Sequence, residues 1–181
     1  MLRNALAVAF ALALPLASAA EEIPLDPNEV SVQDATGKTV AVFSVKQLRA
    51  EFPQQTYDTR TPWTGDNEKI EYRGPLVANV LAKAGVTVAR EVKVVAFDNF
   101  VSDIRMDEIR SYDPILAVER RCNEHDKADS LCPQGQDFRP ISMVEKGPIF
   151  IVWPFDKLPA SYVPARNSIW VFFPVILRAT Q

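Results

Sequence analysis

The clearest hydrophobic pattern lies within residues 72–85, where apolar side chains recur at positions i, i+1, i+4, i+5 and i+8. These side chains are Leu76, Val77, Val80, Leu81 and Ala84. Such spacing predicts a helix with one apolar face that packs against a sheet. Gly74 is expected at the N-cap and Pro75 at the first helical position, which tolerates a fixed φ and a missing N–H. Gly85 is expected to end the helix in the left-handed conformation.

On the N-terminal side of this helix, alternating apolar and polar positions predict strands. The expected strands are residues 30–33, 38–43, 56–61 and 70–72. Ser44 and Gln47 have the spacing of a capping box, which predicts a short helix through Phe52 that Pro53 stops. The chain before the main helix is therefore expected to be mostly strands.

Strands are also expected after the helix. They are residues 92–97, 100–104, 115–118, 149–153 and 168–177, with a short helix over 106–111. The strand over 92–97 is apolar enough to be buried on both faces, and Asp98 and Asn99 are expected to form a turn. Pro174 requires a bulge or an edge position in the last strand, and residues 120–140 are expected to be a long polar loop. Strands outnumber helices without regular alternation, which predicts an α+β fold with a mixed sheet and a few short helices.

The N-terminus has the pattern of a secretory signal peptide. Residues 5–16 are apolar, and the small residues that end at Ala20 offer a cleavage site. We therefore expect a signal peptide over residues 1–20, a flexible leader over residues 21–29 and a single domain over residues 30–181. Because no other stretch approaches a spanning length, we expect a periplasmic or secreted protein without a membrane span after cleavage.

Charge and cysteine content narrow the possible functions. The formal net charge is −3, and loss of Arg3 with the signal makes it −4, so nucleic acid is not an expected partner. Cys122 and Cys132 are the only cysteines, and an oxidising compartment predicts a disulfide between them. His125, the only histidine, lies between them among acidic residues. We favour a polar loop closed by a disulfide over a metal site here, because oxidised cysteines are not metal ligands.

Five stretches, taken in order, carry a family resemblance. They are Tyr72–Leu76 leading into Val80–Val86, Ala96–Phe100 leading into Asp103 and Ile104, Tyr112–Ala117, Glu145–Pro154, and Asn167–Trp170. In amino-acid sequence and in order, they resemble the oxidoreductase molybdopterin-binding domain, the fold of sulfite oxidase, in its small secreted bacterial version. The resemblance covers roughly residues 43–177. It implies a mixed α/β fold of the sulfite-oxidase type.

The resemblance does not extend to the metal ligand. Enzymes of that family hold molybdenum through a cysteine thiolate in the stretch before the Gly-Pro-Leu segment. Here this stretch is Thr59–Thr64, which contains no sulfur, and neither threonine nor proline replaces a thiolate. The signal also has a single arginine, whereas export of a folded, cofactor-loaded enzyme calls for two. We therefore expect no cofactor; the alternative is a molybdopterin-dependent oxidoreductase of the sulfite oxidase type.

The resemblance also implies a cleft at the position where the family binds its cofactor. Its candidate lining residues are Arg60, Trp63, Asn99, Arg166, Asn167 and Ser168. With Trp170 nearby, such a cleft would hold a small molecule through an aromatic wall and a few polar groups, unless it is filled by its own side chains. Trp153 is instead expected in the core. The predicted function is non-catalytic binding of a small ligand or of the extracytoplasmic part of a membrane sensor, through this cleft or the disulfide loop.

Overall fold

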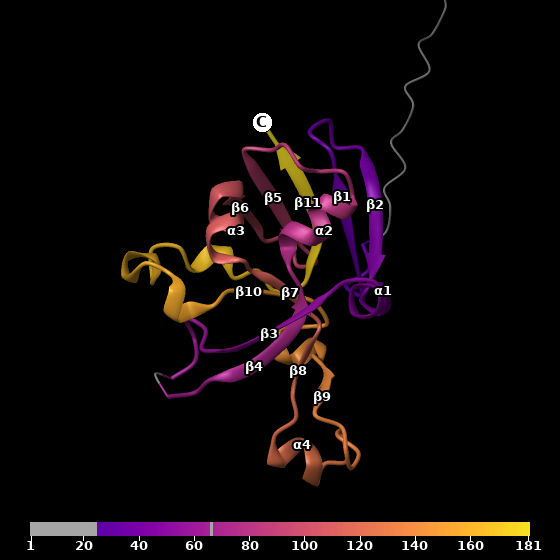
Figure 1. The fold of residues 1–181 in the computed structure, drawn as a ribbon, viewed down its shortest axis with the longest axis vertical. Coiled ribbons are helices and arrows are strands. Elements are labelled where there is room, and N and C mark those ends of the chain that lie inside the picture. Colours follow the sequence, from indigo (N-terminus) through magenta and orange to yellow (C-terminus); the bar gives the residue numbers. More distant parts are fainter. Residues whose placement is uncertain (1–24, 66) are drawn as a thin grey trace, which may run out of the picture.

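Three β-sheets and a few short helices make up the fold of residues 25–65 and 67–181, which the computed structural model describes (Figure 1). The predicted α+β class is confirmed, although three sheets replace the single mixed sheet that we expected. The predicted signal peptide over residues 1–20 lies outside the described residues. In the described part of the predicted leader, the N–H of Glu29 donates to the carbonyl of Asp26 at 3.0 Å and closes a turn before the first strand.

The largest sheet has five strands in the order β2-β1-β11-β5-β6. Its strands are β1 (Glu29–Gln33), β2 (Thr39–Ser44), β5 (Glu91–Ala96), β6 (Val101–Arg105) and β11 (Pro174–Thr180). Only β1 and β11 are parallel, so the sheet is mixed. Burial alternates along β5, and the prediction that this strand is buried on both faces is wrong. Its intervening side chains include Glu91 and Lys93, which a doubly covered strand would not tolerate.

The last strand begins six residues later than predicted. Residues 167–169 form a 3₁₀ turn, and Phe173 has a φ of 53°, which an extended strand cannot contain. Pro174 is the first residue of β11, and the pairing register with β5 shifts between Pro174 and Ile176. The predicted bulge is confirmed. The strand lies at the centre of the sheet, however, because Pro174 needs no ladder hydrogen bond at a strand's first position.

One face of this sheet packs on helices, and α2 lies in front of it in Figure 1. The α-helices of this body are α1 (Val45–Ala50), α2 (Val77–Lys83) and α3 (Met106–Tyr112). The predicted capping box of α1 is confirmed: the N–H of Gln47 donates to the Ser44 hydroxyl at 3.3 Å, and the Ser44 N–H donates to the Gln47 side chain at 3.1 Å. Gly85 follows α2 with a φ of 81°, in the left-handed region that we predicted.

The predicted start of α2 is wrong. Strand β4 (Ile70–Pro75) continues through Gly74 and Pro75, and Leu76 is the N-cap. The reason lies in a neighbouring strand, β7 (Ile115–Ala117): a Cβ atom on Gly74 would lie 1.9 Å from the backbone oxygen of Leu116. Glycine is therefore required here by the close approach of two backbones rather than by a helix cap.

Two smaller sheets complete the body. Strand β4 lies within an antiparallel sheet of order β3-β4-β8-β9, and β7 pairs with β10. The remaining strands are β3 (Gln54–Thr59), β8 (Glu119–Arg121), β9 (Phe138–Pro140) and β10 (Phe150–Val152). Next to β10, Trp153 is fully buried and donates its indole N–H to the carbonyl of Ile169 at 3.0 Å, so its predicted core position is confirmed.

Residues 120–140 are not one long polar loop, as we predicted, but contain a helix and strands. They contain the end of β8, helix α4 (Glu124–Ala128) and β9, and β9 pairs with β8. Together these elements form an arm that projects from the body (Figure 1). The predicted disulfide between Cys122 and Cys132 is confirmed and closes this arm. Four 3₁₀ turns lie elsewhere: η1 (Met143–Glu145), η2 (Phe155–Lys157), η3 (Ala160–Tyr162) and η4 (Asn167–Ile169). No helix in residues 25–65 or 67–181 is long and apolar enough to cross a membrane.

Candidate functional site

A cavity of about 370 Å³ lies where the β5–β6 hairpin, the turn before β4 and the segment around η4 meet. Its lining residues are Trp63, Asp98, Phe100, Asn167, Ser168, Trp170 and Phe172. Four of these seven carry aromatic rings. Trp63 and Phe100 are 49% and 44% exposed, whereas Trp170 is buried. The cavity therefore has a firm inner wall and two rings at an open rim.

Trp63 is held at the rim by a tight turn. The Trp63 N–H donates to the Thr61 hydroxyl at 3.3 Å, and the Thr64 hydroxyl accepts from the Thr61 N–H at 2.8 Å. The indole ring then packs on Phe172, with 5.0 Å between the ring centroids. Because its backbone is fixed and one side of the ring is supported, the exposed indole is ordered without being buried.

The opposite rim is the turn between β5 and β6. The Phe100 N–H donates to Asp98 Oδ1 at 3.1 Å, and the Asn99 N–H donates to the carbonyl of Ala96 at 3.0 Å. Asn99 has a φ of 67°, which asparagine tolerates better than most residues. The turn thus presents the Asp98 carboxylate and the Phe100 ring to the cavity, as the predicted turn at Asp98 and Asn99 allows.

The structure brings three of the six predicted site residues together: Trp63, Asn167 and Ser168 line one cavity. The other three do not line it. Asn99 forms the hairpin turn, and the Arg60 guanidinium stacks on the Phe155 ring at 4.1 Å.

Arg166 is turned away toward a buried carboxylate, that of Glu108. Arg166 donates to both oxygens of Glu108, at 3.2 and 2.6 Å, and Arg105 and the Tyr162 hydroxyl also donate to this carboxylate. Burial, followed by the hydrogen bond to Glu108, raises the pKa of Tyr162 above its ordinary value. These contacts anchor the segment before η4 to α3, so Arg166 positions the cavity wall and does not line it.

Sequence reasoning missed Asp98, Phe100 and Phe172 as lining residues. The first two flank Asn99, so the predicted turn was a signal that could have found them. Phe172 lay within a predicted continuous strand, in which alternate side chains point to opposite faces. The left-handed Phe173 breaks that alternation, and nothing in the sequence pattern announces it.

Strained backbone gathers around this cavity. Asn99, Lys146 and Phe173 have positive φ values of 67°, 75° and 53°. Asn99 and Phe173 each adjoin a lining residue, and Lys146 Nζ lies 5.3 and 5.1 Å from the ring centroids of Trp63 and Phe172. Burial lowers the pKa of Lys146 below its ordinary value. Such conformations cost of order 1–3 kcal/mol each and concentrate at functional sites. Asn99 and Phe173 place two of them beside this cavity, whereas Lys146 lines a separate hollow of about 610 Å³.

Two further hollows, of about 460 Å³ each, flank the side chains of Arg49, Arg73 and Glu119. Glu119 is buried, and its carboxylate accepts from Arg73 Nε at 2.7 Å while Arg49 forms a second ion pair with it. The charged groups of Arg49, Arg73 and Glu119 therefore satisfy one another. An arrangement of this kind stabilises β8 against α1 and β4 and offers few unused groups to a ligand.

The residues present do not fit a molybdenum ion held through a thiolate. In the stretch Thr59–Thr64, Thr61 is buried and its hydroxyl accepts a backbone hydrogen bond. The chain has 2 cysteines, and Cys122 and Cys132 are bonded to each other. Within the described ranges, no three His, Cys, Asp or Glu side chains gather as metal ligands would. The donor set therefore differs from the one that the family resemblance implies.

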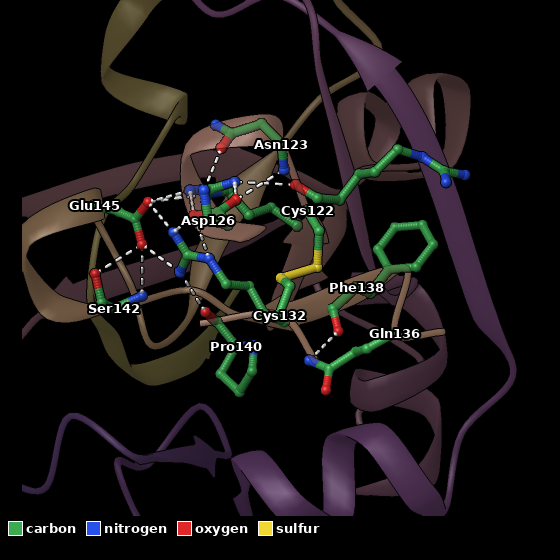
Figure 2. Close-up of polar contacts among 12 residues, drawn as sticks. Cys122, Asn123, Asp126, Cys132, Gln136, Phe138, Pro140, Ser142 and Glu145 are labelled. Carbon is green, nitrogen blue, oxygen red and sulfur yellow. Dashed lines mark hydrogen bonds and ion pairs between the residues drawn. A yellow bond between two sulfur atoms is a disulfide. The ribbon is translucent and has the colours of Figure 1, made fainter. Parts of the chain in front are cut away.

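The arm is held by a network of two arginines and two carboxylates, and Figure 2 shows it beside the disulfide. Arg120 and Arg139 both donate to the carboxylates of Asp126 and Glu145, at 2.6–2.9 Å. Burial acts to raise the pKa of both carboxyl groups, but hydrogen bonds from the two arginines outweigh it. The result is an Asp126 pKa well below its usual range and a Glu145 pKa of about 2.

Comparison with known proteins adds no family assignment. The chain matches no protein-family model, and no curated protein matches it.

Proposed function

We propose that this protein is a non-catalytic binding protein, periplasmic or secreted, that holds a small organic molecule in the cavity beside Trp63. The observation that carries the proposal is the lining of this cavity. Small-molecule sites are concave, have volumes of about 300–1,000 Å³ and combine aromatic walls with a few polar groups. The cavity of about 370 Å³ meets each of these criteria, with polar groups supplied by Asp98, Asn167 and Ser168.

Binding is favoured over catalysis because the cavity offers no pair of reacting groups. Asp98 is the only titratable side chain among the lining residues. General acid–base chemistry requires a proton donor or acceptor of suitable pKa within hydrogen-bond reach of the substrate, commonly with a partner that orients it. The buried carboxylate nearest in the chain to the cavity wall, Glu108, is fully engaged by Arg105, Arg166 and Tyr162.

The alternative, a molybdopterin-dependent oxidoreductase on a sulfite-oxidase-type fold, has less support. It would require a metal ligand that neither Thr61 nor the disulfide-bonded cysteines supply. The disulfide itself is in keeping with a periplasmic or secreted location, where such bonds persist. We therefore propose no resident cofactor.

Mass spectrometry of small molecules that copurify with the protein from its own host tests the proposal. We expect one organic compound to be enriched with the wild type and lost with Trp63→Ala. Phe97→Ala is the matched control, because Phe97 is 41% exposed on the same hairpin rim but does not line the cavity. Equal recovery from the wild type and Trp63→Ala, or molybdenum bound at one atom per chain, would contradict the proposal.

A second candidate function is recognition of the extracytoplasmic part of a membrane sensor by the arm. The arm projects from the body (Figure 1), is closed by the disulfide, and exposes Leu131, which is 55% exposed next to Cys132. Loops that project from a rigid scaffold often carry binding residues, and Leu131 is an exposed apolar side chain on this one. Leu131→Asp should reduce crosslinking of the protein to its membrane fraction, while Val88→Asp, at an exposed position outside the arm, should not.

A further inference from the structure

We infer that the ligand of the aromatic cavity is a small organic cation, such as one with a pyridinium or N-methylated ammonium group. This inference rests on the proposed function, because it assumes that the cavity binds a ligand. It goes further by assigning the charge of that ligand.

The charge of the cavity lining is the first argument. Among the described residues, Asp98 is the only charged one that lines the cavity, and no described lysine, arginine or histidine lines it. The Asp98 carboxylate accepts one hydrogen bond, from the Phe100 N–H, and no basic side chain of the described ranges pairs with it. An anionic ligand would meet this negative charge without a compensating donor. A cation would instead gain an ion pair at the rim of a partly apolar site, where Coulomb attraction is stronger than in bulk water.

The aromatic walls favour a cation for a second reason. The faces of Trp, Phe and Tyr rings carry negative electrostatic potential and attract cations within about 6 Å, an effect that grows when the cation is desolvated. Trp63, Phe100, Trp170 and Phe172 provide four such rings around one space. A flat or N-methylated cation matches these walls in shape as well, because its charge is spread over an apolar surface.

The protein itself already places cations on this group of rings. Lys146 Nζ lies within 5.3 Å of the ring centroids of Trp63 and Phe172. The Arg60 guanidinium lies 4.1 Å from the ring of Phe155, which in turn packs on Trp170. Lys146 does not line the cavity, so a ligand inside meets the carboxylate of Asp98 directly.

A buried hydrogen-bond acceptor without a donor supplies the third argument. Asn167 Oδ1 is buried and has no hydrogen-bond partner in the structure. A buried acceptor without a donor costs about 1–3 kcal/mol, and Asn167 is one of the lining residues. An N–H group on the ligand would satisfy it. The Asn167 oxygen thus lacks a donor and Asp98 lacks a cationic partner, and an organic cation that carries an N–H group supplies both.

Binding of three probes of nearly equal size and shape tests the inference: 1-methylnicotinamide (cation), nicotinamide (neutral) and nicotinate (anion). Quenching of tryptophan fluorescence at low ionic strength reports occupancy next to Trp63 and Trp170. We expect the cation to bind about tenfold more tightly than the neutral probe, and the anion to bind most weakly. Asp98→Asn keeps the acceptor for the Phe100 N–H and should reduce the advantage of the cation to about twofold.

Asp103→Asn is the matched control, because Asp103 is exposed on β6 and pairs with Lys93 outside the cavity. It should leave all three affinities unchanged. If the neutral or anionic probe binds as tightly as the cation, or if Asp98→Asn has no effect, the inference is wrong while the proposed binding function stands. If none of the probes binds at millimolar concentration, and Trp63→Ala does not reduce the recovery of a copurifying compound, the proposed function and the inference are both wrong.

Discussion

The substitution Asp126→Asn should destabilise the arm, because it removes a buried carboxylate that two arginines share. The Asp126 carboxylate is 3% exposed and accepts from Arg120 at 2.7 and 2.8 Å, from Arg139 Nε at 2.7 Å and from the Asn123 N–H at 2.8 Å. Asparagine has nearly the same shape. It removes the negative charge and turns an N–H₂ donor toward groups that are themselves donors.

The size of the destabilisation follows from the two buried arginines that the substitution leaves with one carboxylate fewer. Arg120 and Arg139 are 9% and 7% exposed, and Glu145 would be left as the only carboxylate for both. Removing one partner from a buried ion pair costs about 3–5 kcal/mol, because an uncompensated charge stays buried. A domain of this size has a total stability of about 5–15 kcal/mol. We therefore expect the arm to open locally before the body unfolds.

Hydrogen exchange measured by mass spectrometry separates the two events. Amides of residues 122–139 should lose protection in Asp126→Asn, while those of the five-stranded sheet keep it. The matched control is Asp129→Asn, an exposed position at the C-terminal end of the same helix, which should change the free energy of unfolding by less than about 0.5 kcal/mol. If the two variants behave alike, the desolvation cost of the network cancels its attraction, and the reasoning is refuted.

Three further predictions concern stability. Gly74→Ala should lower the free energy of unfolding by about 3 kcal/mol, because its Cβ would overlap the β7 backbone. Gly65→Ala should be neutral in thermal unfolding, because a Cβ there would make only ordinary contact with the Glu68 side chain. Reducing the disulfide should cost about 2.5–3 kcal/mol in urea denaturation, and an unchanged midpoint would contradict this. The pKa of Glu145 is about 2 in the folded protein against an ordinary 4.5, so the unfolded chain takes up its proton first on acidification. The contribution of Glu145 to the free energy of unfolding should be fully present above about pH 4.5 and be lost as the pH falls toward 2. Glu145→Gln should flatten that part of the plot of stability against pH.

Features fixed by neighbouring residues could be predicted from the sequence. The capping box at Ser44 and the left-handed Gly85 depend on a few residues of local chain, and both are confirmed. Gly74 has a different cause. Its lack of a side chain is required by Leu116, which is distant in sequence, and the pattern around it is equally typical of a helix N-cap. Local pattern identifies an important glycine but not the neighbour that makes it important.

The arm was missed for a related reason. Its charged composition is typical of a solvated loop, yet Arg120, Asp126 and Arg139 become buried by pairing with one another and with the partly buried Glu145. Composition counts such groups but does not say which of them meet. The same limit applies to the cavity: the prediction of Arg166 as a lining residue rested on sequence position, and its pairing with Glu108 is a tertiary contact.

The pattern of ion pairs also bears on our inference that the cavity binds a cation. The buried acidic side chains of the described ranges are Glu108, Glu119 and Asp126, and each is held by two arginines. Because burial of a carboxylate without partners is costly, these arginines are committed to the fold. Asp98 lies at an exposed rim, where an unpaired carboxylate costs little. The fold therefore needs no arginine beside Asp98. This is in keeping with our inference that the cation of a ligand pairs with that carboxylate, as an arginine pairs with each buried acid.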